Sequence, residues 1–426
     1  MDLKRLLPKR SRWGLAAILL FAVGSWASGP RTVVVYKFAG SPDGRFPNGQ
    51  LIADHAGNLY GTTEFGGTSD NGVVFELSPP AVREGKWTET VLYRFSGGSD
   101  GIGPNPGLVF DKSGNLYGTT FDGGNCRYYC GVVFRLAPPT TQGGAWTETI
   151  LHAFGGPNSS DGGAPTGSLV FDKAGNLYGT TEFGGDVSSC GVVFQLSPSA
   201  LPGGLWTETV LYSFTGIPDG QFPVGYLTID KQGTVFGTTT EGGTGACTDG
   251  EGSTIGCGTL FELTSGTGGA WTETVLYNFQ TSDSGSALDL LLDSTGALYG
   301  PAGYDIIKLV PPVRHGDPWT DQVLHQFTGG IRGRYPSSGV ISDPGGNLYG
   351  TTSANGLFSP YGTVYELSPP TMKGRKWTVT TLHRFPGNFS SAQPQGRLLR
   401  GRSGALYGTT SADSFGGNGY VFKIIP

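Results

Sequence analysis

Asp111-Lys112-Ser113-Gly114-Asn115-Leu116-Tyr117-Gly118-Thr119-Thr120 is one of seven similar stretches in this chain of 426 residues. Successive copies lie 50 to 63 residues apart. Repetition at such a period is typical of proteins built from stacked supersecondary units. We take the aromatic residue of each copy as its anchor, and the seven anchors are Tyr60, Tyr117, Tyr178, Phe236, Tyr299, Tyr349 and Tyr407.

Each copy contains four short runs of strand-like composition. In the second copy these are residues 107–110, 115–120, 131–136 and 146–154. Residues 111–114 join the first two runs as a hairpin turn, with glycine where a positive φ is needed. Four antiparallel strands in a unit that cannot cover its own faces indicate a propeller blade. The sequence therefore predicts an all-β fold, a seven-bladed β-propeller of four-stranded blades.

The two ends of the chain predict how the ring closes. Seven fourth-strand patterns occur, and the first, Thr32 to Phe38, precedes any complete copy. The last copy stops after its third strand, Gly419 to Ile424. We expect the N-terminal strand to supply the outer strand of the last blade, because this leaves no unpaired edge. Residues 28–426 would then form a single propeller domain.

Two residue types recur at fixed repeat positions, and we interpret both as structural. Tryptophan stands eight residues before the phenylalanine that ends the fourth strand, where it would pack between blades; the six are Trp87, Trp146, Trp206, Trp271, Trp319 and Trp377. Aspartate stands six residues before the anchor, where a short carboxylate caps the hairpin turn; the six are Asp54, Asp111, Asp172, Asp230, Asp293 and Asp343. One carboxylate per turn is a poor calcium ligand set, so we expect no metal there.

The copies resemble a known tandem repeat. Val91-Leu92-Tyr93-Arg94-Phe95, followed by residues 111–120 and then by Gly131-Val132-Val133-Phe134, is similar to the GloVer repeat. The resemblance covers nearly all of the chain. It implies a choice-of-anchor tandem repeat protein, a group of exported bacterial proteins with differing C-terminal sorting tails and no established activity. No such tail follows Ile425-Pro426, so we expect no surface anchor.

The N-terminal residues are typical of a secretory signal peptide. Five basic residues precede an apolar run from Gly14 to Gly24, and Ser25 and Ala27 offer a small-residue cleavage site. That apolar run is too short to span a bilayer, which needs about 20 residues. We expect residues 1–27 to be removed and the protein to be exported, periplasmic or extracellular, with no membrane anchor in the mature chain.

Composition argues against several classes of partner. The formal net charge is −5, and it becomes more negative once the basic N-terminal segment is removed. An acidic chain disfavours nucleic acid and anionic lipid. Only 14% of residues are charged and 74 are glycine, which favours short strands joined by tight turns. We expect a monomer.

Five cysteines in an exported chain favour disulfide formation. Cys130, Cys190 and Cys257 share one repeat position, and Cys126 and Cys247 lie in the loops before two of them. The shortest pairing joins Cys126 to Cys130 and Cys247 to Cys257, and leaves Cys190 reduced. A metal site at Cys-x-x-x-Cys is the alternative, although no second ligand pair lies nearby in sequence.

Catalytic residues should break the repeat, because residues that obey it are explained by the fold. His152, His325 and His383 replace a tyrosine of the fourth strand and are best interpreted as strand residues. No His-x-x-x-His or Gly-x-Ser-x-Gly arrangement occurs with them. We therefore expect no cofactor and no metal. A site assembled from several blades at the central channel stays open as an alternative.

The loops between second and third strands are the irregular part of the repeat. In the fourth copy this loop is long, and in the fifth it is nearly absent. Loops held on a rigid scaffold often carry function. We expect a ligand site at this step, with Asp249 and Glu251 facing Tyr304 and Asp305. Further candidates on the same rim are Arg127, Tyr128, Tyr129, Arg332, Arg334 and Tyr335.

These patterns predict a noncatalytic binding module that holds a protein or glycan partner on its loop rim. The alternative is an exported polysaccharide-active enzyme, a hydrolase or lyase, with carboxylates that converge on the central channel. We favour binding because no acidic residue outside the turns forms a pair that breaks the repeat.

Overall fold

The computed structural model describes residues 29–47, 49–82, 85–141, 143–186, 189–201, 204–280, 289–314, 317–354, 361–372, 374–385, 393–394, 396–411 and 417–426. The expected signal segment, residues 1–27, lies outside these ranges. The described residues form β-strands and the short 3-10 helix Gly330–Arg332. Among them, no helix is long and apolar enough to cross a membrane.

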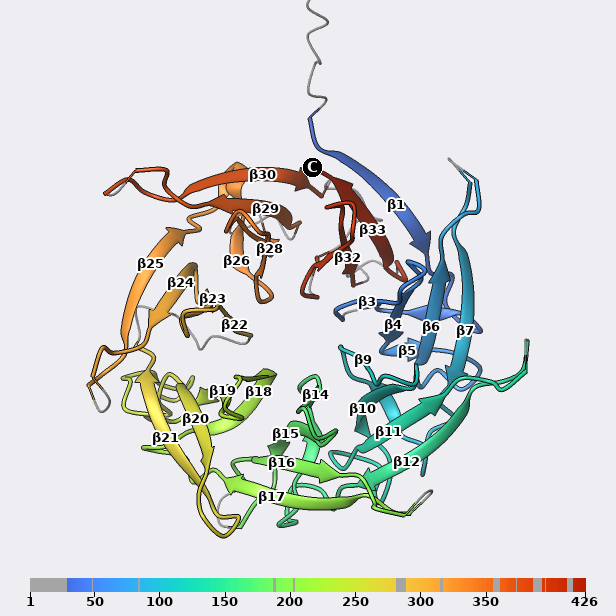
Figure 1. Ribbon diagram of the computed structural model, residues 1–426, viewed down its shortest axis with the longest axis horizontal. Helices are drawn as coiled ribbons and strands as arrows, with labels where there is room; N and C mark the ends of the chain where they lie inside the picture. The colour runs from blue at the N-terminus through green and yellow to red at the C-terminus, as the bar shows by residue number, and fades with distance from the viewer. Residues whose placement is uncertain are drawn as a thin grey trace, which may run out of the picture.

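Seven antiparallel sheets stand around a central axis as the blades of a propeller (Figure 1), which confirms the predicted fold class. Within blades 1 to 6 the chain runs from an innermost first strand to an outermost fourth strand, and in blade 7 the N-terminal strand β1 is the outermost strand. The short ribbon of β2 (Gly44–Arg45) and β5 (Phe65–Gly66) lies outside the blade sheets. The blades in chain order are β3 (Ile52–Ala53), β4 (Leu59–Thr63), β6 (Val73–Ser78) and β7 (Thr88–Arg94); β8 (Ile102–Pro104), β9 (Val109–Phe110), β10 (Leu116–Asp122), β11 (Val132–Ala137) and β12 (Thr147–Ala153); β13 (Gly163–Pro165), β14 (Val170–Phe171), β15 (Leu177–Phe183), β16 (Val192–Ser197) and β17 (Thr207–Ser213); β18 (Gln221–Ile229), β19 (Val235–Glu241), β20 (Thr259–Ser265) and β21 (Trp271–Asn278); β22 (Leu291–Leu292), β23 (Leu298–Ala302), β24 (Asp305–Val310) and β25 (Thr320–Gln326); β26 (Arg334–Pro336), β27 (Ile341–Ser342), β28 (Leu348–Ala354), β29 (Thr363–Ser368) and β30 (Thr378–Arg384); and β31 (Leu399–Arg400), β32 (Leu406–Thr410), β33 (Tyr420–Ile425) and β1 (Arg31–Lys37).

The N-terminal strand closes the ring. β1 pairs antiparallel with β33, and Val34 lies opposite Phe422. In Figure 1 the blue first strand therefore lies beside the red last strand, on the outer side of blade 7. This confirms the predicted closure. The outer edge of β33 is paired, so this strand does not offer a free edge to another chain.

The recurrent aspartate, anchor aromatic and tryptophan connect the hairpin turn of one blade to the next blade. Asp111 accepts hydrogen bonds from the backbone amides of Ser113 and Asn115, and its second oxygen accepts from the Tyr117 hydroxyl at 3.1 Å. The Tyr117 ring in turn contacts Trp206 of the next blade, with 6.0 Å between ring centroids. The aspartates and tryptophans are thus structural residues, as expected.

A glycine after each anchor lets the third strand pack tightly. A Cβ atom at Gly118 would lie 2.6 Å from Phe134 Cζ and 2.9 Å from Leu108 Cδ2. Phe134 is fully buried, and its ring contacts Phe95 of the preceding blade at 5.3 Å. Edge-to-face pairs of this kind stabilise cores beyond the area they bury. The same glycine-aromatic contact recurs at Gly61, Gly179, Gly237, Gly350 and Gly408.

Four consecutive junctions, from blades 7 and 1 to blades 3 and 4, bury a glutamate beside a rim aspartate. At one of them the Tyr93 hydroxyl donates to Glu148 Oε2 at 2.8 Å and lies 3.3 Å from Asp100 Oδ2. Burial, and then the neighbouring carboxylate, raise the pKa of the glutamate at these junctions. The pKa reaches about 7 at Glu89, Glu148 and Glu273.

Gly118→Ala should destabilise the propeller because the new methyl group overlaps the Phe134 ring. Overpacking of this kind costs about 1–3 kcal/mol. Gly250→Ala is the matched control, since a Cβ there meets no atom within 4 Å. Urea unfolding followed by tryptophan fluorescence measures both free energies of unfolding. Equal stability of the two variants would contradict the packing argument.

The junction glutamates should make stability fall as pH rises. Their pKa is about 7 in the folded state against an ordinary value of 4.5, so the folded state binds more protons between these values. The contribution of these glutamates to the free energy of unfolding is therefore largest below pH 4.5. It decreases as the pH rises from 4.5 through about 7.

Buried His325 and His383 have a lowered pKa and act in the opposite direction below pH 6.5. The test therefore compares the wild type with the triple variant Glu89→Gln, Glu148→Gln and Glu273→Gln, in which the histidine contributions are unchanged. The free energy of unfolding of the variant, relative to that of the wild type, should increase as the pH rises from 4.5 to 8. A pH-independent difference would contradict the assignment.

Candidate functional site

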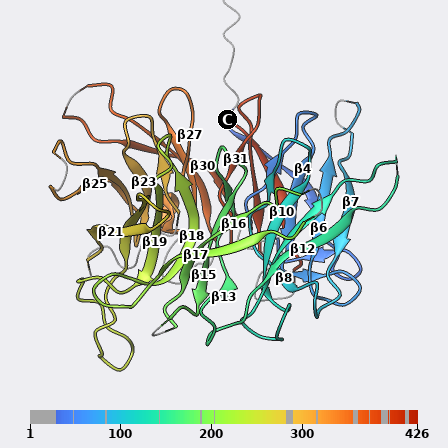
Figure 2. The same ribbon diagram turned by 60° about the horizontal axis from the view of Figure 1, so that its bottom comes forward.

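Two kinds of loop meet on one rim of the propeller. Arg45, between the fourth strand of blade 7 and the first of blade 1, forms an ion pair at 2.6 Å with Asp70, between the second and third strands of blade 1. Figure 2 shows β8 and β13 near this rim, and β27 and β31 near the opposite one. We call it the loop rim, comprising the described residues of 38–46, 64–72, 95–103, 121–131, 154–163, 182–191, 214–222, 241–258, 302–304, 327–335 and 411–419.

Tyr304, Arg334 and Tyr335 come together on the loop rim between blades 5 and 6. The rings of Tyr304 and Tyr335 are 4.9 Å apart, and the Arg334 guanidinium carbon lies 4.8 and 4.9 Å from their centroids. Arg334 Nη2 also donates to the Tyr304 hydroxyl oxygen at 3.2 Å. Hydrogen bonding with Tyr335 and Arg334 lowers the pKa of Tyr304. Tyr335 remains 41% exposed, so the group offers aromatic and cationic surface to a ligand.

Arg45 and Phe46 occupy the same repeat positions in blade 1, but the second ring, Phe65, comes from the same blade, whereas Tyr304 comes from the blade before Arg334. The Arg45 guanidinium carbon lies 5.4 Å from the Phe46 centroid and 4.9 Å from that of Phe65. Here Asp70 holds the arginine with two hydrogen bonds, which lower the pKa of that carboxyl group. Cation-π contact and bidentate pairing together fix the guanidinium.

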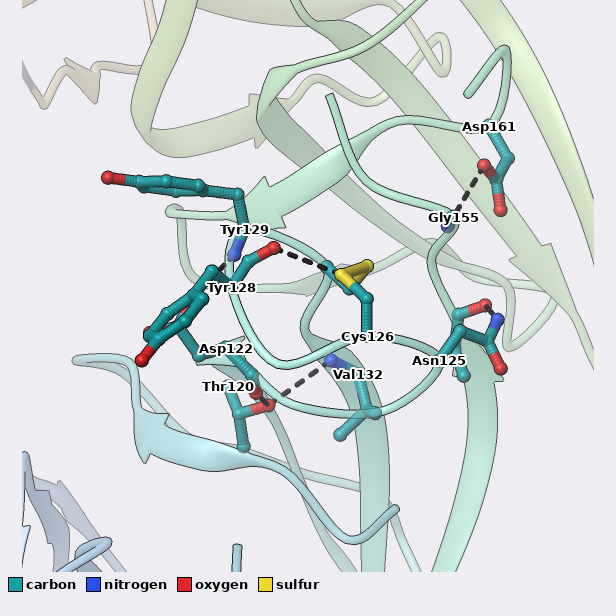
Figure 3. Close-up of a disulfide and its surroundings, with 11 residues drawn as sticks. Thr120, Asp122, Asn125, Cys126, Tyr128, Tyr129, Val132, Gly155 and Asp161 are labelled. Atoms are coloured by element: carbon teal, nitrogen blue, oxygen red, sulfur yellow. Dashed lines mark hydrogen bonds between the residues drawn. A yellow bond between two sulfur atoms is a disulfide. The ribbon is translucent and has the colours of Figure 1, made fainter. Parts of the chain in front are cut away.

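The Cys126 loop places a third aromatic group on the rim (Figure 3). The disulfide joins Cys126 to Cys130, as predicted, and the Tyr129 amide donates to Asp122 Oδ1 at 2.6 Å. Tyr129 is 47% exposed and its ring contacts both Phe121 and Phe183. Figure 3 shows the ring of Tyr129 projecting away from the disulfide.

Residues next to Tyr129 extend the aromatic surface of the rim. Arg127 lies 5.2 Å from the Tyr128 centroid, and Tyr128 is 60% exposed. On the other side, Phe183 contacts Phe222 of the next blade at 5.6 Å. The rings of Phe121, Tyr129, Phe183 and Phe222 thus form a continuous row across three blades.

Three rim aromatics occupy a strained backbone conformation. Phe46, Phe222 and Tyr335 each precede the first proline of an innermost strand and have φ of 58°, 56° and 56°. Blade 2 has Gly103 at this position, the residue for which a positive φ costs least. Blade 3 has Ala164 there, fully buried and with φ of 50°, so the positive φ recurs from blade to blade and belongs to the repeat. A bulky residue with such φ costs about 1–3 kcal/mol and persists where the surroundings enforce it. Here the backbone amides of Phe46, Ala164 and Phe222 each donate to a carbonyl of the preceding blade, which holds this conformation. Phe46, Phe222 and Tyr335 therefore differ from the other blades in the aromatic ring that they present, and not in the backbone.

The expected site between blades 4 and 5 has a different layout from the one predicted. Cys247 and Cys257 form the predicted disulfide, and Cys190 is a buried thiol. Asp249 caps a turn within the long loop by accepting from the amides of Glu251 and Ser253.

The partners expected for that loop lie elsewhere. Asp305 begins β24, where it pairs with Gln326 and is only 8% exposed, so its side chain does not face the rim surface. Tyr304 contacts blade 6, as described above. Arg332 is exposed at the end of the 3-10 helix.

A second candidate region lies in the central channel, which the sequence left open as an alternative without naming any of its residues. The innermost strands share the pattern Pro-x-Gly-x-Leu or a variant of it. The fourth residue of this pattern is glycine in two blades and is a different residue in each of the other five. These residues are Gln50, Gly107, Ser168, Tyr226, Asp289, Gly339 and Arg397. Three of them, Tyr226, Asp289 and Arg397, line a cavity of about 180 Å³ together with neighbouring residues of blades 2 to 7.

An ion pair crosses this cavity. Arg397 Nη1 lies 3.4 Å from Asp289 Oδ1, and the two side chains are 14% and 4% exposed. Arg397 Nη2 donates to the Val340 carbonyl at 3.0 Å. Burial raises the pKa of Asp289, although Arg397 and a hydrogen bond from the Gly339 backbone to the carboxylate oppose the rise. Asp289 Oδ2 and Arg397 Nε have no hydrogen-bond partner among the described residues.

Tyr226 forms the apolar wall of the cavity. Its backbone bridges to Asp289, and burial raises the pKa of its hydroxyl to about 12. The Tyr226 phenol is therefore a hydrogen-bonding group and not a base near neutral pH. Asn105, Thr166 and Ser337 have a structural role, since each donates to a proline carbonyl of the next blade.

Comparison with solved structures supports the propeller fold. A streptogramin B lyase is 13% identical over 93% of this chain and 97% of that chain, with a TM-score of 0.55. A catalytically inactive virginiamycin B lyase from Staphylococcus aureus, with quinupristin, is 14% identical over 93% and 99%, with a TM-score of 0.53. An extracellular domain of a two component system from B. thetaiotaomicron is 13% identical, with a TM-score of 0.53; this chain spans 42% of that one. At such identities the likeness shows the fold alone.

Sequence comparison identifies the family. No curated protein matches the chain. The Gloeobacter/Verrucomicrobia repeat matches residues 25–249 and 245–426, which is nearly the whole chain and confirms the resemblance drawn from the seven copies. The chain therefore belongs to the Gloeobacter/Verrucomicrobia repeat family.

Proposed function

We propose that the protein is an exported, noncatalytic binding module that holds a macromolecular partner, a glycan or a protein, on its loop rim. The observation that carries this proposal is the group of Tyr304, Arg334 and Tyr335 on the loop rim, in which the Arg334 guanidinium carbon lies 4.8 and 4.9 Å from the two ring centroids. Tyr335 is 41% exposed, so the group presents an ordered aromatic and cationic surface to a partner.

The composition of the rim supports binding. Tyrosine and arginine are enriched in the energetic hot spots of binding surfaces. Tyrosine buries a large area at the cost of only two χ angles. Arg334 and Arg45 are each held between two rings, so a partner would meet a preorganised surface. Preorganisation raises affinity by lowering the entropy lost on association.

The enzyme alternative has less support. Glycosidases in most families use two carboxyl groups about 5 to 10 Å apart. Among the described residues that line the channel cavity, Asp289 is the one carboxylate, and it is paired with Arg397. The lyases named above share the fold at 13–14% identity, which carries no activity to this chain.

Export is supported by three independent features. Two disulfides occur in this chain, and such bonds persist in oxidising compartments. The first 27 residues have the pattern of a signal peptide. A propeller of similar fold forms an extracellular domain in B. thetaiotaomicron.

The Tyr304→Ala and Tyr335→Ala double variant should lose partner binding. Truncating hot-spot aromatics costs about 2 kcal/mol or more, so affinity should fall at least about tenfold. Wild type and variant are compared on an array of bacterial and plant polysaccharides and on a displayed peptide library. Leu205→Ala is the control, since this side chain is 88% exposed on a loop of the opposite rim.

Binding that is lost in Leu205→Ala and kept in the tyrosine double variant would contradict the proposal. Release of soluble fragments from an arrayed polysaccharide by the wild type would favour the enzyme instead. Unchanged thermal unfolding of both variants shows that the comparison reports on binding.

A further inference from the structure

The channel cavity has features that no structural role explains. Its pair of Asp289 and Arg397 comes from blades 5 and 7, and a buried ion pair contributes little net stability because desolvation offsets the attraction. Two atoms of the pair, Oδ2 and Nε, lack hydrogen-bond partners among the described residues. Buried polar atoms in native proteins are nearly always paired, so such orphans call for a ligand or ordered water.

We propose that this cavity binds one neutral sugar unit, and that the unit belongs to a glycan whose further residues lie on the loop rim. The inference rests on the proposed function in one respect: it takes the rim partner to be a glycan. The cavity itself is argued from its own charge, hydrogen-bonding groups, size and position.

Charge favours a neutral ligand. Asp289 and Arg397 compensate each other at 3.4 Å. An anionic or cationic ligand in the same cavity would leave one charge uncompensated in a poorly solvated place, which is costly. A neutral polar molecule meets no such penalty.

Hydrogen bonding favours hydroxyl groups. Asp289 Oδ2 can only accept while ionised, and Arg397 Nε can only donate. A hydroxyl both donates and accepts, so two adjacent hydroxyls of one ring satisfy both orphan atoms at once. The hydroxyls of Ser337 and Thr166 donate to proline carbonyls, so toward a ligand they can only accept. The ring of Tyr226 offers an apolar face for the C–H side of a sugar.

Size favours a single ring. The cavity of about 180 Å³ is smaller than pockets for drug-sized ligands, which begin at about 300 Å³. It equals the liquid volume of about six water molecules. One monosaccharide unit suits this space, whereas a disaccharide would have to extend out of it.

Position connects the cavity with the rim. β18 carries Phe222 at the rim and Tyr226 in the cavity. Four residues of regular strand would span about 13 Å, and the bulge between Val224 and Thr228 shortens this distance. Phe222 therefore lies within two to three sugar units of Tyr226, and one glycan chain can contact both.

The test is a titration of the full chain with monosaccharides by ligand-observed NMR. The probes are D-glucose, D-galactose, D-mannose and D-xylose, with D-glucuronate and D-glucosamine as charged counterparts. At least one neutral sugar should bind saturably, and the charged counterparts should bind at least about tenfold more weakly. No saturable binding of any neutral sugar would overturn the proposal and leave the cavity to ordered water only.

Variants then assign the binding to the cavity. Asp289→Leu combined with Arg397→Met replaces the ion pair by apolar side chains, a change that folded proteins often tolerate, and should abolish sugar binding. Tyr226→Ala removes the apolar ring face and should weaken binding several-fold, about the value of one aromatic contact. Arg400→Gln, on exposed β31, is the control and should bind as the wild type does.

The two proposals fail in distinguishable ways. Sugar binding that survives in the double variant, verified as folded by circular dichroism, would overturn the channel site without touching the rim. The Tyr304→Ala and Tyr335→Ala variant should keep monosaccharide affinity and lose polysaccharide affinity. If it keeps both, the rim proposal fails while the channel site stands.

Discussion

The structure depends on close approach between strands at the anchor glycine. In five blades a phenylalanine, and in one a tyrosine, lies directly over this glycine, and the phenylalanines that end the fourth strands contact the same rings across the blade junction. Any side chain at the glycine would push the third strand outward. Because each blade packs on both neighbours, a change of spacing in one blade would be felt around the ring, and β1 would no longer meet β33 in register.

The close packing of the blades fixes some repeat positions and leaves others free to vary. Anchor, aspartate, tryptophan and glycine are each held by a contact that recurs from blade to blade. The position before the last residue of the Pro-x-Gly-x-Leu pattern is held by no such contact, and there the blades carry Ser168, Tyr226, Asp289 and Arg397. A repeat fold of this kind can build an asymmetric polar site in its channel without disturbing the blades.

Sequence alone predicted the blade number, the closing strand and both disulfides, because each depends on counting copies of a local pattern. It did not predict the meeting of Asp289 and Arg397, which are far apart in the chain and become neighbours only in the closed ring. Aligning the seven innermost strands would have marked their position as irregular. The buried position of Asp305 was also missed, because the fifth blade shortens its loop so far that this residue starts β24.

The account holds that residues which break the repeat around the channel form a ligand site. The most direct measurement is a crystal structure of the protein soaked in the neutral monosaccharides. The account predicts electron density for one sugar ring between Tyr226 and the ion pair of Asp289 and Arg397, with hydroxyls bonded to Oδ2 and Nε. Ordered water alone in the cavity, with the sugar bound on an outer face of the blades, would contradict it.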